Sequence, residues 1–461
     1  MRLEEIKSVY FIGIGGIGMS ALARWFKERN IAVAGYDKTK TILCHQLEAE
    51  GIPIHFEEDL DQIDADFQNQ ENTLVVYTPA VPENHLELRF FQKENFTVMK
   101  RSEVLGMISK GHYTVAIAGT HGKTTTSSMV AHILNQTDKG CSAFVGGIMT
   151  NYNTNMIYGA ADAPVVVEAD EFDRSFHRLS PNYSVVTSVD LDHLDIYGSE
   201  EEIQKSFGEF VQKTAEDGHL LIQYKSAEKI SNYLDNLYYT YGIDAGDYQA
   251  KALRAADGIF YFNYHGKEVI KDLKLMVPGF HNVENAVAAI SVALDLGIDP
   301  VTVKDAIASY KGVKRRFEYV IKDKKMVYID DYAHHPTEIT SFLRSVRSLY
   351  PLKKITAVFQ PHLFSRTNDF YREFAKSLEL ADDIILLDIY PAREEPMKGV
   401  TSEIILERIE KKNKAIVPRE QLISKLEEKS VEVLVTMGAG DIDKEVVRLK
   451  NHFIDKHEIE A

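Results

Sequence analysis

The stretch from Thr114 to Ser128, TVAIAGTHGKTTTSS, decides the fold expected for the middle of this chain. It begins as an apolar, β-rich run, breaks at Gly119 and Gly122, and continues through Lys123 and Thr124 into a helix-compatible segment. A glycine turn at a helix N-terminus offers unpaired backbone N–H groups to phosphate oxygens. The lysine can neutralise a transferring phosphoryl group, and the threonine hydroxyl can hold Mg²⁺. This G-x-x-G-K-T-T loop is shorter than the usual phosphate loop, but it predicts a nucleoside triphosphate site between a strand and a helix.

The length and composition are consistent with an enzyme of several domains. At 461 residues the chain is too long for one ordinary core, and roughly three domains are expected. The net charge of -16 would repel a nucleic-acid backbone or an anionic membrane surface, so neither is an expected partner. The cysteines, Cys44 and Cys141, have no metal-site or disulfide-framework spacing, which indicates a reducing compartment. The N-terminal MRLEEIKSVYFIGIGGIG is neither a signal peptide nor a membrane span, so we expect a cytoplasmic protein. The expected assembly is a monomer or a homodimer.

Strands and helices alternate along the chain, which predicts an α/β fold with parallel sheets. The expected strands are 9–13, 31–36, 73–78, 165–168, 184–189, 220–223, 326–329, 355–359, 384–387 and 431–436, together with the run at Thr114. The expected helices include 19–29, 200–213, 337–350 and 441–453, and residues 257–277 form a β-rich insert. Boundaries near Gly106 and Gly312 give domains 1–106, 107–312 and 313–461.

A second glycine turn occupies the first strand-to-helix connection. Gly13-Ile14-Gly15-Gly16-Ile17-Gly18 is followed by Asp37, just after the next expected strand. This is the dinucleotide fingerprint in its usual context, in which a pyrophosphate approaches a helix N-terminus and a carboxylate meets a ribose hydroxyl. The motif does not distinguish NAD from another diphosphate-linked nucleoside, and it also fits a turn that only packs a strand against a helix.

Acidic clusters follow the expected strands next to the triphosphate loop. The strand in VVVEADEFD ends at Glu168, Asp170 and Glu171, and the strand in VVTSVDLDHLDIYG ends at Asp190, Asp192, His193 and Asp195. Ligands of open α/β sheets bind at the carboxyl ends of strands, where these side chains lie. Carboxylate oxygens and an imidazole beside a triphosphate suit Mg²⁺ better than zinc. Taken one at a time, these acids fit solvated loops or helix caps equally well.

Polar side chains are also grouped in the C-terminal half. In VPGFHNVEN, Asn282 is a plausible N-cap, which leaves His281 and Asn285 unexplained. A basic run, KRRFE, precedes DDYAHHP, whose adjacent histidines suit a metal site, a His–carboxylate pair or a helix cap. The segment QPHLFSRT then places His362 and Arg366 after another strand.

Taken together and in order, these motifs resemble those of the Mur ligases over essentially the whole chain. The matching segments are GIGGIGMS, AGTHGKTTT, EADEFD, DLDHLDIYG, PGFHNVEN, KGVKRRFE, DDYAHHPTE, FQPHLFSRT and DIYPAREEPMKGVTS. The resemblance implies a Rossmann-like domain for a UDP-sugar, a central P-loop ATPase domain and a C-terminal Rossmann-like domain for an amino acid. The motifs are most similar to those of the member that adds L-alanine to UDP-N-acetylmuramate. The resemblance also implies the reaction: ATP phosphorylates the lactyl carboxylate, and the alanine amine attacks the resulting acyl phosphate.

The resemblance assigns roles to individual residues. Expected catalytic residues are Lys123, His193, His334 and Arg366. Expected ATP-binding residues are Gly119, Thr120, His121, Gly122, Lys123, Thr124, Thr125, His281, Asn285, Arg316 and Asp331. Expected Mg²⁺ ligands are Thr124 and Glu168 for one ion and His193 for a second. Expected substrate-binding residues are Gly13, Gly15, Gly16, Gly18, Met19, Ser20, Asp37, Tyr332, His334, His362 and Arg366, the last pairing with the alanine carboxylate.

Some positions depart from the family pattern. Phe172 stands where serine is common, and Phe280 where arginine is common. Ala333 stands where glycine is common, and Leu363 where arginine sometimes occurs. None of them removes a group that the chemistry needs. The carbamylated lysine of the ligases that add later amino acids would fall near Phe207, where no lysine occurs, and this favours the alanine-adding member.

Three alternative functions remain open on the sequence. The nearest is the recycling ligase that joins a whole peptide to the same nucleotide sugar, and the alanine at position 333 slightly favours it. QPHLFSRT and DIYPAREEPMKGVTS favour the alanine-adding enzyme instead. A nicotinamide-dependent oxidoreductase would use the first glycine turn but not Lys123 or the acidic clusters. A P-loop regulatory protein would use ATP as a switch and need no amino-acid site.

Overall fold

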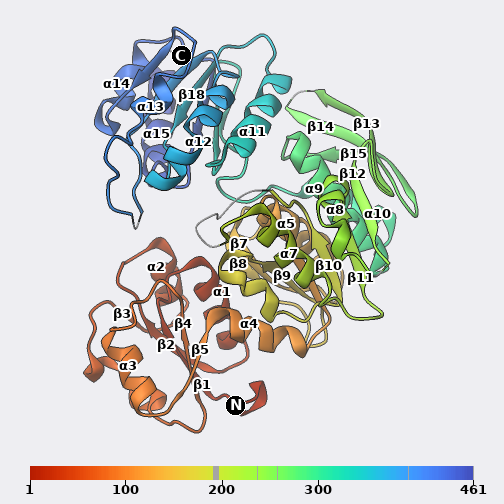
Figure 1. Ribbon diagram of the computed structural model, residues 1–461, viewed down its shortest axis with the longest axis vertical. Coiled ribbons are helices and arrows are strands. Elements are labelled where there is room, and N and C mark those ends of the chain that lie inside the picture. The colour runs from red at the N-terminus through yellow and green to blue at the C-terminus, as the bar shows by residue number, and fades with distance from the viewer. Residues whose placement is uncertain (191–196, 236, 257, 393, 460–461) are drawn as a thin grey trace. The chain divides into compact units, whose positions relative to one another are not determined.

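The structure is a computed structural model that describes residues 1–190, 197–235, 237–256, 258–392 and 394–459. It is an α/β protein whose described residues form three sheets, each built mainly of parallel strands (Figure 1). Backbone contacts divide the chain into two compact units. The first comprises Met1–Lys251, Tyr264–Lys271 and Glu284–Tyr310, and the second comprises Ala252–Asn263, Asp272–Val283 and Lys311–Ala461. Among the described helices, none combines the length and the apolar character that a membrane span requires.

The N-terminal sheet is entirely parallel, with the strand order β3-β2-β1-β4-β5. Its strands are β1 (Ser8–Ile12), β2 (Ala32–Tyr36), β3 (Ile54–His55), β4 (Thr73–Tyr77) and β5 (Thr97–Lys100). Its helices are α1 (Ile17–Glu28), α2 (Ile42–Ala49), α3 (Leu86–Lys93) and α4 (Arg101–Lys110). Every residue of β1 is buried, as expected of a central strand covered on both faces. The only tryptophan of the chain, Trp25, lies buried on α1 in this part of the core.

The central sheet has the strand order β15-β14-β13-β12-β11-β10-β6-β9-β7-β8. Its strands are β6 (Thr114–Ala118), β7 (Ser142–Met149), β8 (Thr154–Ile157), β9 (Val165–Ala169), β10 (Tyr183–Val186), β11 (His219–Gln223), β12 (Tyr239–Ile243), β13 (Tyr248–Ala256), β14 (Ile259–His265) and β15 (Val269–Leu275). Its helices are α5 (Lys123–Leu134), α7 (Glu200–Val211), α8 (Tyr224–Lys229), α9 (Phe280–Asp295) and α10 (Pro300–Ser309). The fully buried β6 lies between β10 and β9, to both of which it pairs in parallel. The expected phosphate loop therefore leaves the sheet between two parallel neighbours.

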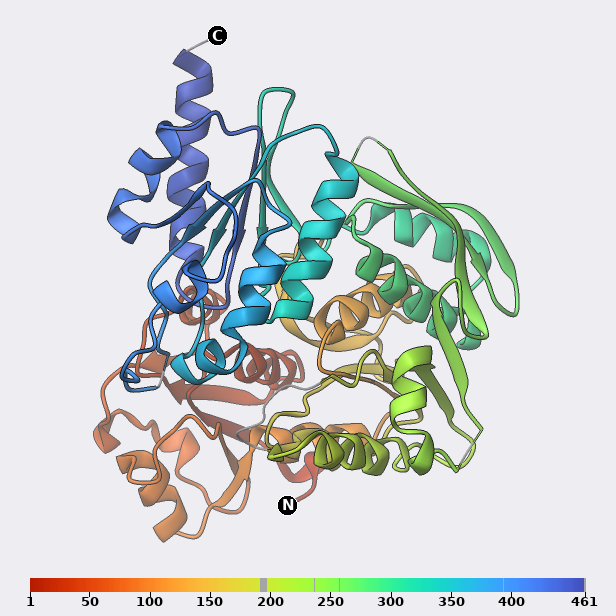
Figure 2. The same cartoon turned by 45° about the horizontal axis from the view of Figure 1, so that its top comes forward.

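The C-terminal sheet has the order β16-β17-β21-β18-β19-β20, and only its edge strand β16 is antiparallel. Its strands are β16 (Glu318–Lys322), β17 (Val327–Asp331), β18 (Ile355–Phe359), β19 (Asp383–Leu386), β20 (Lys414–Ile416) and β21 (Val433–Met437). Its helices are α11 (Pro336–Leu349), α12 (Phe364–Leu378), α13 (Glu403–Leu406), α14 (Leu422–Glu427) and α15 (Asp443–Ile459). Leu422, Leu426 and Leu449 of α14 and α15 join one core cluster with Val358 and Leu434 of the sheet. Figure 2 shows α11 and α12 on the other side of this sheet from α15.

The expected elements are confirmed, with two informative shifts. The strand expected over 184–189 ends at Val186, because the next residues leave the sheet to contact the phosphate loop. The β-rich insert expected over 257–277 forms β14 and β15 and begins earlier, with β13; residue 257 lies outside the described residues. Short 3-10 helices occur at Leu3–Glu5, Leu60–Gln62, Ala65–Phe67, Phe172–Arg178, Ser231–Tyr233 and Arg419–Gln421.

Candidate active site

The loop between β6 and α5 has the conformation that its glycines predict. Gly119 and Gly122 have φ angles of +142° and +84°, which side-chain-bearing residues rarely adopt. A Cβ atom on Gly119 would overlap the Thr187 hydroxyl, and one on Gly122 would lie 2.8 Å from Asn285 Oδ1. The loop thus packs closely against the end of β10 and against α9. Asn285, expected on the adenine side of an ATP site, lies beside the phosphate loop.

Two hydroxyls that follow β10 hold the phosphate loop in place. Ser188 Oγ accepts a hydrogen bond from the His121 backbone N–H at 2.7 Å and bonds to Thr120 Oγ1 at 2.8 Å. Thr187 Oγ1 donates to the Ala118 carbonyl at 3.0 Å. These bonds fix the turn in the conformation that a phosphate-binding loop requires. No pattern in the sequence singles out this Thr-Ser pair.

Lys123, the first residue of α5, is held by a buried carboxylate. Its Nζ lies 2.6 Å from Glu171 Oε2 and donates to the Gly119 carbonyl at 2.6 Å. Burial acts to lower the lysine pKa, but the negative charges of Glu171, Asp170 and Glu168 outweigh it and raise the pKa above its ordinary value. Lys123 is therefore a fixed positive charge within the loop. Sequence reasoning placed Glu171 in an acidic cluster but did not connect it to the lysine.

Thr124 and Glu168, both expected to bind Mg²⁺, are in contact. Thr124 Oγ1 donates to Glu168 Oε1 at 2.9 Å, and Glu168 Oε2 accepts from the Gly146 backbone N–H at 2.8 Å. A hydroxyl and a carboxylate beside a triphosphate loop fit Mg²⁺, which is held by few protein oxygens together with phosphate oxygens and water. Within the described residues, no group of three or more His, Cys, Asp or Glu side chains forms a ready metal site. His193, expected at a second ion, lies outside the described residues, as do Asp192 and Asp195.

Asp190, the first acid of the second cluster, contacts two basic side chains. Asp190 Oδ1 accepts from Lys229 Nζ at 2.7 Å, and its Oδ2 lies 3.9 Å from His121 Nε2. The backbone N–H of Asp190 donates to Thr120 Oγ1 at 3.1 Å. Asp190 therefore connects the chain after β10 to the phosphate loop and to α8.

The first glycine turn joins β1 to α1, as the dinucleotide fingerprint predicts. Gly13 has φ +87°, and Gly16 is the N-cap of α1. Asp37 lies at the end of β2, where its Oδ2 accepts from the Gly15 backbone N–H at 2.8 Å and its Oδ1 from the Thr39 N–H at 2.9 Å. Asp37 thus stabilises the turn by accepting these hydrogen bonds, in addition to any contact with a ligand. Met19 and Ser20, both buried, continue α1.

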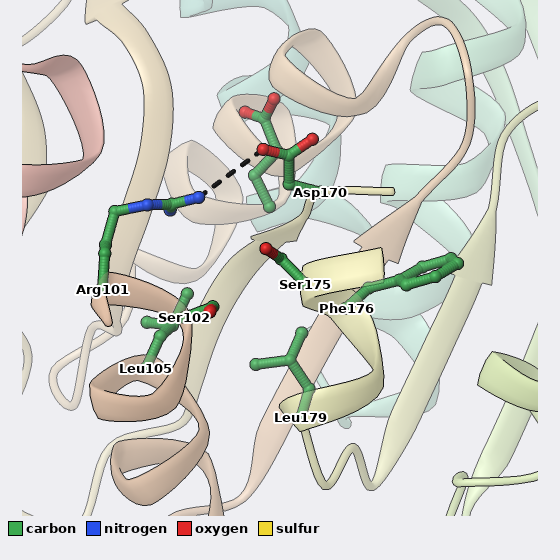
Figure 3. A pocket seen from close by; sticks show the side chains of 8 residues that line it. Arg101, Ser102, Leu105, Asp170, Ser175, Phe176 and Leu179 are labelled. Carbon is green, nitrogen blue, oxygen red and sulfur yellow. Dashed lines mark ion pairs between the residues drawn. The ribbon is translucent and has the colours of Figure 1, made fainter. Parts of the chain in front are cut away.

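A cavity of about 310 Å³ connects the glycine turn to the carboxylate of Glu168. Its lining residues include Gly16, Gly18, Arg101, Glu168 and Asp170. Figure 3 shows the adjoining smaller pocket, where Arg101 of α4 points towards Asp170, and the two groups lie 3.5 Å apart. The cavity therefore joins the first glycine turn to Glu168, whose carboxylate contacts Thr124 of the second glycine loop. Arg101 is a further candidate residue that no sequence motif indicates.

In the second unit, the DDYAHHP motif is organised around two buried aspartates. Asp330 lies 3.0 Å from Arg315 Nε and accepts from Thr436 Oγ1 at 2.6 Å. Asp331 accepts from the backbone N–H groups of Phe317 and Ala333 at 2.7 and 2.8 Å. Burial raises the pKa of Asp330 to about 6 and that of Asp331 to about 7. Asp331, expected at the ATP site, here joins the KRRFE segment to the end of β17.

The two adjacent histidines have different roles. His335 is the N-cap of α11 in a capping box with Glu338, which confirms the cap interpretation for this residue. His334 Nδ1 lies 3.0 Å from the Tyr332 carbonyl and 3.3 Å from Glu338 Oε2. The Tyr332 ring also lies beneath the Arg316 guanidinium, whose Cζ is 4.9 Å from the ring centroid.

The QPHLFSRT segment brings His362 next to the DDYAHHP motif. The His334 and His362 ring centroids are 6.2 Å apart, and His362 stacks on Tyr390. Arg366 lies in the first turn of α12, which follows directly. The expected amino-acid-binding residues of this unit therefore gather at the carboxyl ends of β17 and β18.

The expectation for Asn282 is wrong. α9 begins at Phe280, so Asn282 lies inside its first turn, and its Nδ2 donates to the Pro278 carbonyl at 2.8 Å. The positive φ of Gly279, +130°, sets the start of the helix earlier than the capping pattern suggests. His281 belongs to the second unit, where its Nδ1 lies 3.1 Å from Ser341 Oγ, and burial lowers its pKa to about 4.

The departures from the family pattern have structural explanations in part. Phe280 packs edge-to-face against Phe260, with ring centroids 5.3 Å apart. Leu363 has φ +70° and is the N-cap residue of α12, and Ala333 is buried. Phe207 is a core residue of α7 that contacts Phe176, with ring centroids 5.3 Å apart. Nothing in the structure explains Phe172.

Comparison with known proteins defines the class. The Mur ligase family catalytic domain matches residues 8–113, the Mur ligase middle domain 117–293, and the Mur ligase glutamate ligase domain 315–440. The chain belongs to the Mur ligase family.

Its relatives indicate the branch of the family. It is 50% identical to the UDP-N-acetylmuramate–L-alanine ligase of Flavobacterium psychrophilum, over 99% of this chain and 100% of the relative. It is 49% identical to that of Christiangramia forsetii, over 97% and 98% of the two chains. The crystal structure of the Thermotoga maritima UDP-N-acetylmuramate–alanine ligase matches with a TM-score of 0.80 and 30% identity, over 98% and 100%. A murein peptide ligase from Psychrobacter arcticus, at 22% identity and a TM-score of 0.67 over 96% and 98%, shares the fold.

Proposed function

We propose that this protein is an ATP-dependent ligase that joins L-alanine to the lactyl carboxylate of UDP-N-acetylmuramate in peptidoglycan precursor synthesis. One observation carries the proposal beyond the resemblance of the motifs. A single cavity of about 310 Å³ is lined both by the first glycine turn and by Glu168 of the phosphoryl-transfer site. A nucleotide sugar held by its diphosphate at the turn can extend its lactyl group through this cavity. NAD offers no carboxylate acceptor for such a site.

The chemistry requires activation of the carboxylate. An amine cannot displace oxide from a carboxylate at a useful rate, so a lactyl oxygen first attacks the γ-phosphorus of ATP and ADP leaves. The alanine amine then attacks the carbonyl carbon of the acyl phosphate. The tetrahedral intermediate collapses to the amide with loss of phosphate and of an amine proton.

The residues of the phosphate loop supply electrostatic stabilisation. Lys123, already charged and fixed between Glu171 and the Gly119 carbonyl, lies where it can neutralise the transferring phosphoryl group. Thr124 and Glu168 would hold Mg²⁺, which when bound supplies positive charge to the phosphate oxygens. Residues Gly119 to Thr125 would contact the phosphates. By the family resemblance, His281, Asn285, Arg316 and Asp331 would complete the ATP site, and His193 would hold a second ion.

The amino-acid side is assigned to the second unit. Arg366 would pair with the alanine carboxylate, beside Tyr332, His334 and His362. The proximity of the His334 and His362 rings, at 6.2 Å, supports a common site for this motif set.

We further infer that the domain boundaries lie near residues 106 and 312 and that the enzyme is cytoplasmic.

The decisive experiment is phosphate release with ATP, Mg²⁺ and UDP-N-acetylmuramate, with either L-alanine or a murein tripeptide as the acceptor. We expect turnover with alanine only. Turnover with the tripeptide alone would assign the protein to the recycling branch. Calorimetry should show binding of UDP-N-acetylmuramate and none of NAD, and micromolar NAD binding with no response to the sugar nucleotide would contradict the ligase assignment.

The structure selects the best variant for locating the sugar nucleotide. A Cβ on Gly15 would overlap Cys44 Sγ, so substitution there would disturb the fold as well as the ligand. Gly16 lines the cavity, and a Cβ added to it would lie 3.6 Å from its nearest neighbour, the Gly13 carbonyl oxygen. Gly16→Val should therefore fold, with a small loss of stability because valine is a poor N-cap for α1, and should lose UDP-N-acetylmuramate binding. Unchanged affinity would exclude this turn as the diphosphate site.

The metal assignment has its own test. Glu168→Gln should raise the Mg²⁺ concentration for half-maximal rate about 10-fold or more. Glu202→Gln is the matched control, because the Glu202 side chain is 43% exposed and pairs with the partly exposed Arg174 at 3.3 Å, away from the cavity. Identical Mg²⁺ titrations of the Glu168→Gln and Glu202→Gln variants would mean that Glu168 has a structural role only.

A further inference from the structure

Arg101 stands out among the side chains of the cavity. The charged residues among its described lining residues are Arg101, Glu168 and Asp170, so Arg101 supplies the only positive charge within that set. The nucleotide sugar of the proposed function carries two phosphates and one carboxylate. A cavity that admits this anion with two carboxylates on its wall needs a compensating cation, and Arg101 meets that need in the described part of the chain.

The guanidinium lies directly over the first turn of α1. A Cβ added to Gly18 would be 2.9 Å from both Cδ and Nη1 of Arg101. Gly18 is the second residue of α1, where backbone N–H groups have no acceptor within the helix. The absence of a side chain at Gly18 is what allows the arginine to reach across from α4. An oxyanion seated on this helix turn would therefore have a guanidinium beside it.

The present partner of Arg101 is one that a substrate can replace. Asp170 lies 3.5 Å from the Arg101 guanidinium (Figure 3). The Asp170 side chain is 39% exposed and the Arg101 side chain 25%. A long, partly exposed ion pair contributes little to stability. A substrate phosphate or carboxylate that accepted two parallel N–H bonds from the guanidinium would be a stronger partner than Asp170 in its single 3.5 Å contact.

We propose that Arg101 is a substrate-binding residue that grips an oxyanion of the nucleotide sugar, exchanging Asp170 for the ligand as the substrate enters. The inference rests on the proposed function for the identity of the ligand. The oxyanion is either the diphosphate, over the α1 turn, or the lactyl carboxylate, on its way to Glu168. Both have the same recognition chemistry, and a sugar nucleotide without the lactyl group separates them.

The test is calorimetry of UDP-N-acetylmuramate with the full-length protein and its variants. Arg101→Gln should weaken binding roughly 10- to 100-fold, with partial recovery in Arg101→Lys. Asp170→Asn should leave the affinity unchanged or raise it up to about fivefold, because it removes the competing partner. The matched control is Arg178→Gln: Arg178 pairs with Glu103 of the same helix α4 at 3.8 Å and does not line the cavity. Melting temperatures check that each variant is folded.

UDP-N-acetylglucosamine, which has the diphosphate but no lactyl group, distinguishes the two sources. An equal loss of affinity for both sugar nucleotides in Arg101→Gln assigns the diphosphate, whereas a loss confined to UDP-N-acetylmuramate assigns the carboxylate. A folded Arg101→Gln protein with wild-type affinity for UDP-N-acetylmuramate overturns the inference, and so does a weaker-binding Asp170→Asn. If the wild-type protein itself fails to bind UDP-N-acetylmuramate, the proposed function fails instead, which is a separate result.

Discussion

At the scale of single residues, Lys123 illustrates how the site prepares a charge before its ligand arrives. The ammonium group is paired at 2.6 Å with the buried Glu171, so it is charged and fixed in the loop. In the proposed site ATP would compete with Glu171 for this lysine, which would keep its contact with the loop carbonyl of Gly119.

Lys123→Ala should abolish ligation while leaving UDP-N-acetylmuramate binding intact. Loss of one stabilising group at a developing charge typically costs about 10²–10³ in kcat, and loss of a full charge costs more. The measurement is phosphate release at saturating substrates, with calorimetry for the sugar nucleotide. Lys139→Ala, which removes an exposed lysine of the same unit paired with Asp162, is the control. A Lys123→Ala rate within threefold of wild type would contradict the assignment.

At the scale of elements, the turn from β6 to α5 depends on the close approach of the chain after β10. Gly119→Ala should destabilise the first unit by about 2 kcal/mol or more, since it adds both a disfavoured φ of +142° and an overlap with Thr187. Gly297 has φ +84° with no atom within 4 Å of an added Cβ, so Gly297→Ala should cost only about 1 kcal/mol. Chemical denaturation of the two variants gives the comparison, and equal costs would show that the contact is unimportant.

The packing of α3 on β1 makes the N-terminal domain sensitive to pH. Glu87 of α3 is completely buried, accepts from Tyr10 of β1 at 2.8 Å, and has its pKa raised to about 7 by burial. In the unfolded chain this carboxyl titrates near 4.5. Between these two values the unfolded chain has lost a proton that the folded protein keeps, so the contribution of Glu87 to stability falls as pH rises.

Glu87→Gln should remove this dependence, because the amide oxygen still accepts from Tyr10 but does not ionise. The difference in free energy of unfolding between wild type and variant should change by on the order of 3 kcal/mol from pH 4.5 to above 7, in favour of the variant at high pH. Trp25 fluorescence reports on this domain. Glu83→Gln, an exposed position just before α3, serves as the control and should show no such trend. A constant difference across this range would refute the buried-acid account.

At the scale of the whole molecule, an acidic protein takes up anionic substrates. The net charge of -16 repels UDP-N-acetylmuramate at long range, while the glycine turn and Arg101 attract it only at close range. Raising the salt concentration from about 10 to 150 mM shortens the screening length from about 30 to 8 Å. The association rate constant from stopped-flow fluorescence should therefore rise severalfold. A fall over the same range would mean that the local positive charge controls the encounter.

The sequence by itself determined the class, the reaction and most elements of this protein. The glycine turns at Gly13 and Gly119 follow apolar runs and precede helices, and this local order fixes where the strands end and the helices begin. Apolar periodicity predicted the strands because both faces of a central parallel strand are buried. The motif order identified the family, and the comparisons confirm it.

Only the tertiary structure decided which side chains meet. It paired Lys123 with Glu171, placed the Thr187 hydroxyl against Gly119, and moved the start of α9 ahead of Asn282. It also brought Arg101 across Gly18, although no motif contains that arginine. The physical reason is that strand order in a sheet joins segments far apart in the chain at one edge. Neighbouring residues encode where a strand or helix forms, but the partners of a side chain at that edge depend on which strands lie next to each other.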